Sequence, residues 1–193
     1  MRAAALLLAG VGMTAMAQGP LVEGKADSAV RVLIFEDLQC SDCAAFRAML
    51  DGKLLPQYGN KAAFEHRDFP LAKHAWARKA AVASRYFQGL RLETAVQFRQ
   101  EAMKAQRQVS AETFEGWLRG FCEKHGLDAE KASAALGDAK LGALVEKDFQ
   151  DGVARGIART PTVLVNGEPF IETFTFEEIA KGIETALKEN GIQ

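Results

Sequence analysis

Two cysteines, Cys40 and Cys43, flank Ser41 and Asp42 where an apolar, strand-like run ends and a helical pattern begins. A sulfur at the start of a helix lies beside unpaired backbone N–H groups and the positive end of the helix dipole, and both stabilise a thiolate. A second cysteine one turn later can close a disulfide with it. The spacing therefore indicates thiol-disulfide chemistry, with Cys40 as the nucleophile and Cys43 as the resolving thiol.

The composition is that of an ordinary globular chain. Its 193 residues are 48% hydrophobic and 25% charged, which suffices for one domain with a good core. The formal net charge is -1, and the sequence contains no cluster of Lys and Arg that would suit a phosphate backbone. Nucleic acid is therefore not expected as a partner.

The first 17 residues have the pattern of a secretory signal peptide. Arg2 precedes an apolar stretch over about residues 3–13, and Ala-Met-Ala at 15–17 has the small-x-small form that signal peptidase cleaves. An N-terminal membrane anchor is the alternative, but it needs about 20 apolar residues. We expect a signal peptide at 1–17 and a single domain at 18–193 in the periplasm or cell envelope.

Hydrophobic patterning predicts strands on either side of the cysteine helix. Residues 29–35 are short, β-branched and nearly all apolar, as in a central strand buried on both faces. The helix that follows is expected to end near Gly52 and Pro56. A second strand is predicted at about 62–69.

A long helical block follows the second strand. From residue 71 to about 145 the sequence is rich in Ala, Glu, Gln, Lys and Arg, and it carries apolar stripes such as Trp76, Ala80, Ala83 and Phe87. The block predicts three or four helices packed as a subdomain.

The C-terminal part predicts a helix, a hairpin and a final helix. Phe149, Val153 and Ile157 mark the first helix, in which Gly152 and Gly156 would allow close approach to a sheet. Asn-Gly at 166–167 favours a type I′ turn between strands at 162–165 and 170–171. Thr175 and Glu178 form a capping box at the start of the last helix, which ends at Gly191.

In this order the elements resemble the DsbA family of bacterial envelope thiol-disulfide oxidoreductases, in particular its shorter DsbA-like thioredoxin branch. The resemblance implies a thioredoxin-like α/β fold, in which helices flank a central mixed β-sheet and an all-helical subdomain is inserted at about 71–145. A C-x-x-C about 120 residues before a Thr-Pro that leads into a strand and Asn-Gly is a specific combination. The matching stretches are FEDLQCSDC at 35–43, RDFPL at 67–71 with His74, the Ala-rich run after Trp76, Gly126-Leu127-Asp128, and GIARTPTVLVNG at 156–167.

The resemblance also implies a substrate site and partners. Pro161 would be cis and face the cysteines, and the backbone of Thr160 would pair with an extended substrate segment; the alternative for Pro161 is an ordinary strand-start proline. Exported proteins with thiols or disulfides would be the clients, and a membrane partner of the DsbB or vitamin-K-epoxide-reductase (VKOR) type would reoxidise the protein. The chemistry needs no metal, nucleotide or flavin cofactor.

Ser41 and Asp42 depart from the Pro-His that strong oxidases of this family carry between their cysteines. A carboxylate roughly 6 Å from the Cys40 sulfur interacts with a thiolate by about 0.7 kcal/mol in water and about 2.8 kcal/mol at an effective dielectric near 20. We therefore expect Asp42 to raise the pKa of Cys40 and to make the protein more reducing than a Pro-His oxidase. Alternatively, Asp42 is a first-turn helix residue that points to solvent.

A second departure lies six residues before Cys40. Many relatives have a buried acid there that moves a proton for the second cysteine, whereas this chain has Ile34. Strand alternation places Glu36 on the same face, two residues closer to the cysteines. Glu36 could act as the proton carrier, or it could be a solvated carboxylate at the strand end.

The remaining cysteine and the histidines suggest no second site. Cys122 lies on an apolar helical stripe and is interpreted as a buried, inert thiol rather than a regulatory or intermolecular one. The three histidines are scattered, so a zinc site built from Cys40, Cys43 and a histidine is not favoured. The stripe comprises Phe114, Trp117, Leu118, Phe121 and Cys122, and the histidines are His66, His74 and His125.

These inferences predict an enzyme, a thiol-disulfide oxidoreductase that works as an oxidase. Three alternatives stay open. Asp42 and Thr160 favour a reductase or isomerase of the same fold. The chain could instead be a peptide-binding or chaperone module with a redox-idle cysteine pair, or a metal carrier.

Overall fold

The computed structural model describes residues 19–192, so the predicted signal peptide lies outside the described residues. A five-stranded mixed sheet forms the centre, in the order β1-β3-β2-β4-β5. The pair β2 and β3 is parallel, and the other three pairs are antiparallel. The strands are β1 (Leu21–Gly24), β2 (Arg31–Glu36), β3 (Ala63–Asp68), β4 (Thr162–Val165) and β5 (Glu168–Ile171). The predicted thioredoxin-like fold is confirmed.

The edge strand β1 was not predicted. Its four residues, Leu-Val-Glu-Gly, are too few to show an alternating pattern, and they become a strand by pairing with β3. Leu21 lies opposite His66 and Glu23 lies opposite Phe64. The β1 strand thus places Glu23 at the edge of the sheet, beside β3.

The cysteine helix is longer than the sequence indicated. Helix α1 (Ser41–Met49) continues through the π-helical turn η1 (Leu50–Leu54) into α2 (Leu55–Tyr58). The prediction that Gly52 and Pro56 end the helix was therefore wrong. Pro56 lies in the first turn of α2, directly after the π-helical turn, where the lack of a backbone N–H is tolerated.

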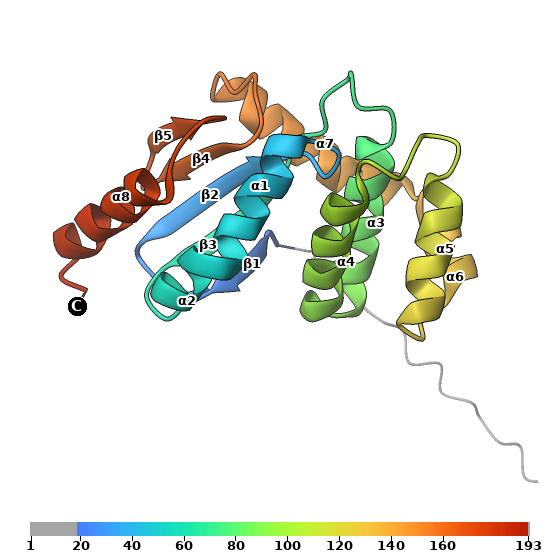
Figure 1. Cartoon of the computed structure of the whole chain (residues 1–193), viewed down its shortest axis with the longest axis horizontal. Coiled ribbons are helices and arrows are strands. Elements are labelled where there is room, and N and C mark those ends of the chain that lie inside the picture. The colour runs from blue at the N-terminus through green and yellow to red at the C-terminus, as the bar shows by residue number, and fades with distance from the viewer. Residues whose placement is uncertain (1–18, 193) are drawn as a thin grey trace, which may run out of the picture.

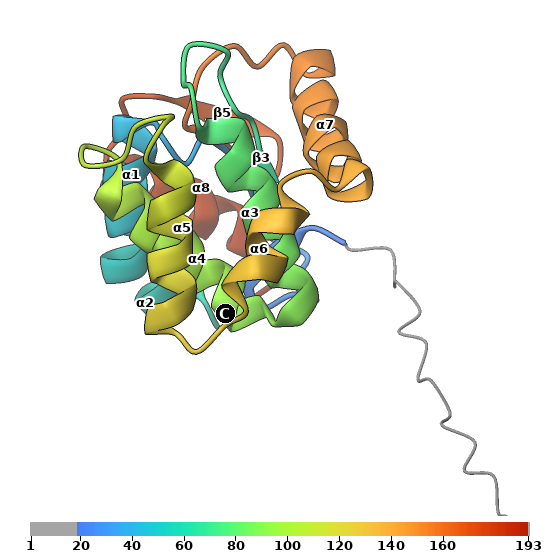
Figure 2. The ribbon, with the colours of Figure 1, turned by 90° about the vertical axis from the view of Figure 1, so that its right-hand side faces the viewer.

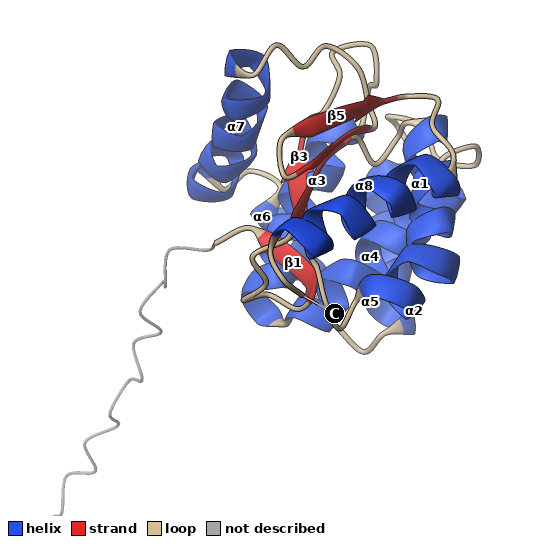
Figure 3. Ribbon diagram, turned by 90° about the vertical axis from the view of Figure 1, so that its left-hand side faces the viewer, coloured by secondary structure: helices blue, strands red, loops and turns tan. Residues whose placement is uncertain are grey.

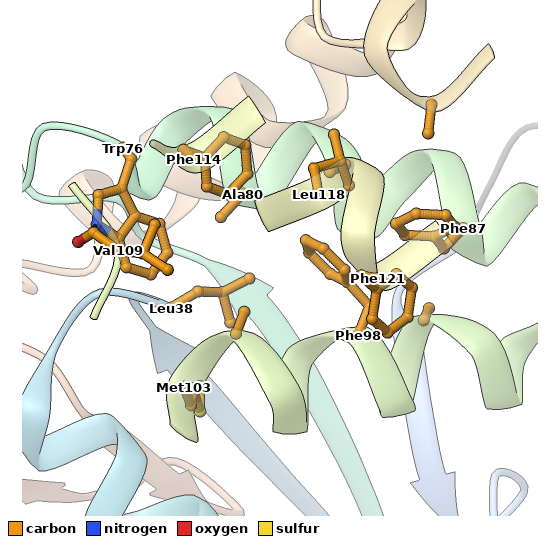
Figure 4. Packing of buried hydrophobic residues seen from close by; sticks show 14 of the residues in the cluster. Leu38, Trp76, Ala80, Phe87, Phe98, Met103, Val109, Phe114, Leu118 and Phe121 are labelled. Atoms are coloured by element: carbon orange, nitrogen blue, oxygen red, sulfur yellow. Dashed lines mark hydrogen bonds between the residues drawn. The ribbon is translucent and has the colours of Figure 1, made fainter. Parts of the chain in front are cut away.

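The predicted helical block forms a subdomain beside the sheet (Figures 1 and 2). It contains α3 (Ala77–Leu90), α4 (Leu92–Ala105), α5 (Phe114–Lys124) and α6 (Ala129–Ala135). Its apolar core includes the predicted stripe of Trp76, Ala80, Ala83 and Phe87, and Figure 4 shows Leu38, from the loop before Cys40, among these side chains. Cys122 is fully buried in this core, as predicted. Within residues 19–192, no helix is long and apolar enough to span a membrane.

Helix α7 (Ala139–Ala154) covers the sheet face opposite α1 and the C-terminal helix α8 (Phe176–Glu189) (Figure 3). Gly152 allows this contact, because a Cβ there would lie 2.6 Å from the ring of Phe69. Gly156 instead follows the helix with a φ of 77°. Val153, one of the residues that marked this helix in the sequence, is 48% exposed, because the sheet contact is made on the side of α7 that carries Asp148 and Gly152.

The C-terminal elements follow the prediction closely. Asn166 and Gly167 have φ angles of 46° and 98°, as a type I′ turn requires, and they join β4 to β5. Thr175 and Glu178 form the expected capping box of α8 (Phe176–Glu189). Ile179, Ile183 and Leu187 pack this helix on the sheet.

Candidate functional site

Cys40 and Cys43 lie at the start of α1, at the border between the sheet and the helical subdomain. Cys40 is the N-cap residue, in extended conformation with φ -80° and ψ 129°, and Cys43 lies in the first turn. Cys40 is 7% exposed, whereas Cys43 is fully buried. Only Cys40 is therefore open to a protein substrate.

The surroundings of Cys40 stabilise a thiolate. The pKa of Cys40 is lowered to about 5, chiefly by the hydrogen bond from the Cys43 thiol. Burial opposes this by raising the pKa, while Thr160 and the backbone N–H groups of Cys43 and Asp42 lower it further. At neutral pH Cys40 is a thiolate, the reactive form in disulfide exchange.

Cys43 has the opposite character. Burial raises the pKa of Cys43 well above its ordinary value, and the neighbouring Cys40 and Glu36 raise it further. The backbone N–H of Asp37 donates to the Cys43 sulfur at 3.4 Å. In the reduced pair, Cys40 is thus the reactive thiolate and Cys43 is the buried, protonated thiol.

The fold brings Thr160 and Pro161 to the cysteines. The Thr160–Pro161 peptide bond is cis, and the Cys40 Sγ lies 3.4 Å from the backbone oxygen of Thr160 across 120 residues of sequence. Thr160 is 2% exposed. The loop before β4 therefore forms one wall of the site.

Ser41 and Asp42 are both exposed on the first turn of α1. Asp42 acts on Cys40 through its backbone N–H, which lowers the pKa of the thiol. The sequence had predicted a raised pKa for Cys40 because of the Asp42 carboxylate. Because that carboxylate is solvated, its effect is small beside the hydrogen bonds to the sulfur.

Glu36 is a buried carboxylate, so the alternative interpretation as a solvated carboxylate at the strand end is wrong. It is 2% exposed, it accepts a hydrogen bond from Arg99 Nη2 at 2.9 Å, and its Oε1 lies 2.5 Å from Nδ1 of His66. Burial would raise the pKa of Glu36, but the charges of His66 and Arg99 hold it below its usual value. Its second oxygen, Oε2, is buried without a hydrogen-bond partner among residues 19–192.

Asp37 anchors the loop that leads into Cys40, a role that sequence reasoning missed. Its carboxylate accepts from the backbone N–H groups of Gln39 at 2.7 Å and Leu71 at 2.8 Å. It also contacts Nδ1 of His74 at 2.7 Å. His74, which the resemblance marked, thereby ties the start of the helical block to the cysteine loop.

The histidines stay apart from the sulfurs. His66 is bound between Glu36 and Glu23, His74 contacts Asp37, and His125 contacts Glu101. In the part of the chain that the structure describes, no three or more His, Cys, Asp or Glu side chains gather as a metal site would require.

Comparison with known proteins places this arrangement in a class. The solved structure of oxidised BdbD from Bacillus subtilis matches with a TM-score of 0.79 at 23% identity, covering 88% of this chain and 93% of that one. Wolbachia pipientis α-DsbA1 matches with a TM-score of 0.76 at 16% identity, covering 88% and 92%. A protein-disulfide isomerase from Novosphingobium aromaticivorans matches with a TM-score of 0.68 at 16% identity, covering 88% and 99%. The chain thus has the fold of DsbA-like thiol-disulfide oxidoreductases, with its cysteine pair at the start of α1.

The family follows from the sequence itself. The family model described as Thioredoxin matches residues 16–185, which is most of the chain, and the chain belongs to this family. Comparison with curated protein sequences gave no significant match.

Proposed function

We propose that this oxidoreductase is an oxidase, which donates the Cys40–Cys43 disulfide to exported proteins. The observation that carries the proposal is the contrast between the two thiols. A Cys40 with a pKa of about 5 makes the reduced form stable and therefore makes the disulfide a good oxidant.

The reaction would proceed through a mixed disulfide. A substrate thiolate attacks Cys40 of the oxidised pair, the Cys40–Cys43 bond breaks, and the Cys43 thiolate that leaves takes up a proton. A second substrate thiolate then attacks the substrate sulfur of the mixed disulfide and releases the Cys40 thiolate. Two substrate thiolates become one disulfide, and the protein gains the two electrons.

We assign substrate positioning to Thr160 and Pro161, and proton transfer to Glu36. The contact between Cys40 and the backbone of Thr160 supports the first role, since a substrate strand bound there would present its sulfur to Cys40. The buried Oε2 of Glu36 supports the second, because Glu36 acts on Cys43 electrostatically and has an oxygen free to accept a proton.

Cell-envelope location and the partners are part of the proposal. The signal pattern at 1–17 supports export to the periplasm, where protein thiols meet oxidising conditions. Each turnover leaves the pair reduced, so an electron acceptor is needed, and a membrane partner of the DsbB or VKOR type would serve.

The reduction potential tests the direction of the reaction. The pair is equilibrated in glutathione buffers with Cys122 replaced by Ser, and the disulfide fraction is measured. A potential near roughly -120 mV supports the oxidase, and one near roughly -270 mV would assign the protein to reductases. A pair that forms no disulfide would favour the peptide-binding module.

Asp42→His is expected to raise that potential by up to about 30 mV. The exposed carboxylate at 42 disfavours the Cys40 thiolate slightly, by no more than about one pKa unit, and a histidine removes this repulsion. Ser41→Ala serves as the control, since it leaves the local charge unchanged. An unchanged or lower potential in Asp42→His would show that Asp42 has no tuning role.

A further inference from the structure

Glu36, His66 and Glu23 form a line across three neighbouring strands of the sheet. His66 in the middle of β3 pairs with Ile34 of β2 on one side and with Leu21 of β1 on the other. Glu36 is two residues along β2 from Ile34, and Glu23 is two residues along β1 from Leu21. Because side chains two apart share a strand face, all three side chains lie on the face that α1 covers.

The line is joined by hydrogen bonds. Nδ1 of His66 lies 2.5 Å from Oε1 of Glu36, and Nε2 lies 2.9 Å from Oε1 of Glu23. The His66 side chain has no exposed area, and that of Glu36 has 1%. The imidazole therefore bridges two carboxylates inside the protein.

The two ends of the line meet different surroundings. Glu36 precedes Asp37, whose N–H binds the Cys43 sulfur, and its charge raises the pKa of Cys43. The Glu23 side chain is 12% exposed and lines a surface hollow between β1, Leu55 of α2 and Val96 of α4. The line thus runs from the strand end beside the buried cysteine to the hollow at β1, which is an edge strand of the sheet (Figure 1).

We propose that His66 and Glu23 carry protons between Glu36 and the hollow, so that Cys43 exchanges its proton with water at the β1 edge. This rests on the proposed redox function of Cys43. Proton transfer accounts for a buried imidazole between two carboxylates, since each nitrogen of the His66 ring can hold and release one proton.

Each step moves one proton. The S–H bond of Cys43 breaks and an O–H bond forms on Oε2 of Glu36, which neutralises Glu36. The charge of Glu36 raises the pKa of His66, so its loss weakens the hold on the imidazolium. His66 then gives its Nε2 proton to Glu23, which passes it to water in the hollow. Reduction of the disulfide runs the same steps backwards.

Charged neighbours surround both ends of this line and keep the carboxylates ionised at rest. At the Glu36 end, Arg99 of α4 bonds both Glu36 and Asp68 of β3. At the Glu23 end, Arg47 of α1 bonds both Glu23 and Asp51 of η1. These ion pairs also stabilise the fold, so the test separates proton transfer from stability.

Oxidation of the reduced protein by glutathione disulfide makes that separation. Cys40 first forms a mixed disulfide with glutathione, and Cys43 must then lose its proton to close the ring. Samples are quenched at intervals, and mass spectrometry gives the fractions of the mixed disulfide and of the closed disulfide, over a pH series in H₂O and in D₂O. The variants are His66→Gln and Glu23→Gln. The matched control is Glu65→Gln, a buried glutamate on β3 that is held by Arg31 and Arg67 instead.

The rate at which the Cys40–Cys43 disulfide closes is expected to fall by roughly tenfold or more in both variants at neutral pH. This rate should recover as the pH rises, because hydroxide can then take the proton of Cys43. Their solvent isotope effect should exceed that of the control. Formation of the mixed disulfide should keep its wild-type rate, and because that rate depends on the lowered pKa of Cys40 in the folded site, it also reports that the variants fold. If His66→Gln does not fold, Glu23→Gln decides the question.

Two results would count against the proposal. Closure in Glu23→Gln within twofold of the Glu65→Gln control at every pH would overturn the route through Glu23. Failure of the wild-type protein to form the mixed disulfide would instead refute the proposed redox function.

Discussion

Cys40→Ser should lower thiol-disulfide exchange by at least about 10³-fold. The mixed disulfide can form only on a sulfur that a substrate thiolate reaches. Cys43 and Cys122 are fully buried, and both have a raised pKa. Neither thiol can replace Cys40. The measurement is the rate at which oxidised protein converts a reduced two-cysteine peptide to its disulfide.

Two companion variants make this result specific. Cys122→Ser should keep full turnover, because Cys122 lies in the core of the helical subdomain. Cys43→Ser has no disulfide to donate, but its Cys40 thiolate should attack the disulfide of the oxidised peptide and accumulate a mixed disulfide, because no Cys43 thiol is present to resolve it. If Cys40→Ser retained turnover, the assignment of the nucleophile would be wrong. If the wild type bound the peptide tightly without oxidising it, the protein would be a binding module.

Arg99→Met should lower the free energy of unfolding by about 3–5 kcal/mol. Arg99 is 2% exposed, and its guanidinium donates to Asp68 and Glu36 at 2.9 Å each. The methionine fills a similar volume but leaves two buried carboxylates with less compensating charge, which is the expensive part of the change. Urea unfolding followed by circular dichroism gives the loss.

Arg78→Met is the matched control. Arg78 also lies in the helical subdomain and pairs with Glu146, but the two side chains are 54% and 43% exposed. An exposed pair contributes less than about 1 kcal/mol, so this variant should unfold almost as the wild type does. Equal losses in the two variants would mean that Arg99 does not act through its buried carboxylates.

The regular elements were predictable because their signals are local. The apolar run at 29–35, the Asn-Gly turn at 166–167 and the capping box at Thr175 each specify structure within a few residues. The errors arose where tertiary contacts decide. The β1 strand exists through its pairing with β3, and Gly52 lies inside a helix that a π-helical turn carries onward.

The residues of the candidate site also fall into those that local sequence signals predicted and those that depend on tertiary contacts. The spacing of Cys40 and Cys43 indicated their chemistry, and the resemblance pointed to Thr160 and Pro161. Strand alternation also placed Glu36 on the face of Ile34. Its burial could not be predicted, because the partner that neutralises it, Arg99, lies 63 residues away in the sequence. No local pattern links the two.

The pH titration of the Cys40 thiolate tests the account most directly. Thiolate ultraviolet absorbance and the rate of alkylation are followed in the reduced protein, with Cys122 replaced by Ser. The lowered pKa predicts that both signals are full at neutral pH and fall with a midpoint at about pH 5. A midpoint near the ordinary cysteine value of about 8.5 would mean that the site does not stabilise the thiolate, and it would contradict the proposed oxidase.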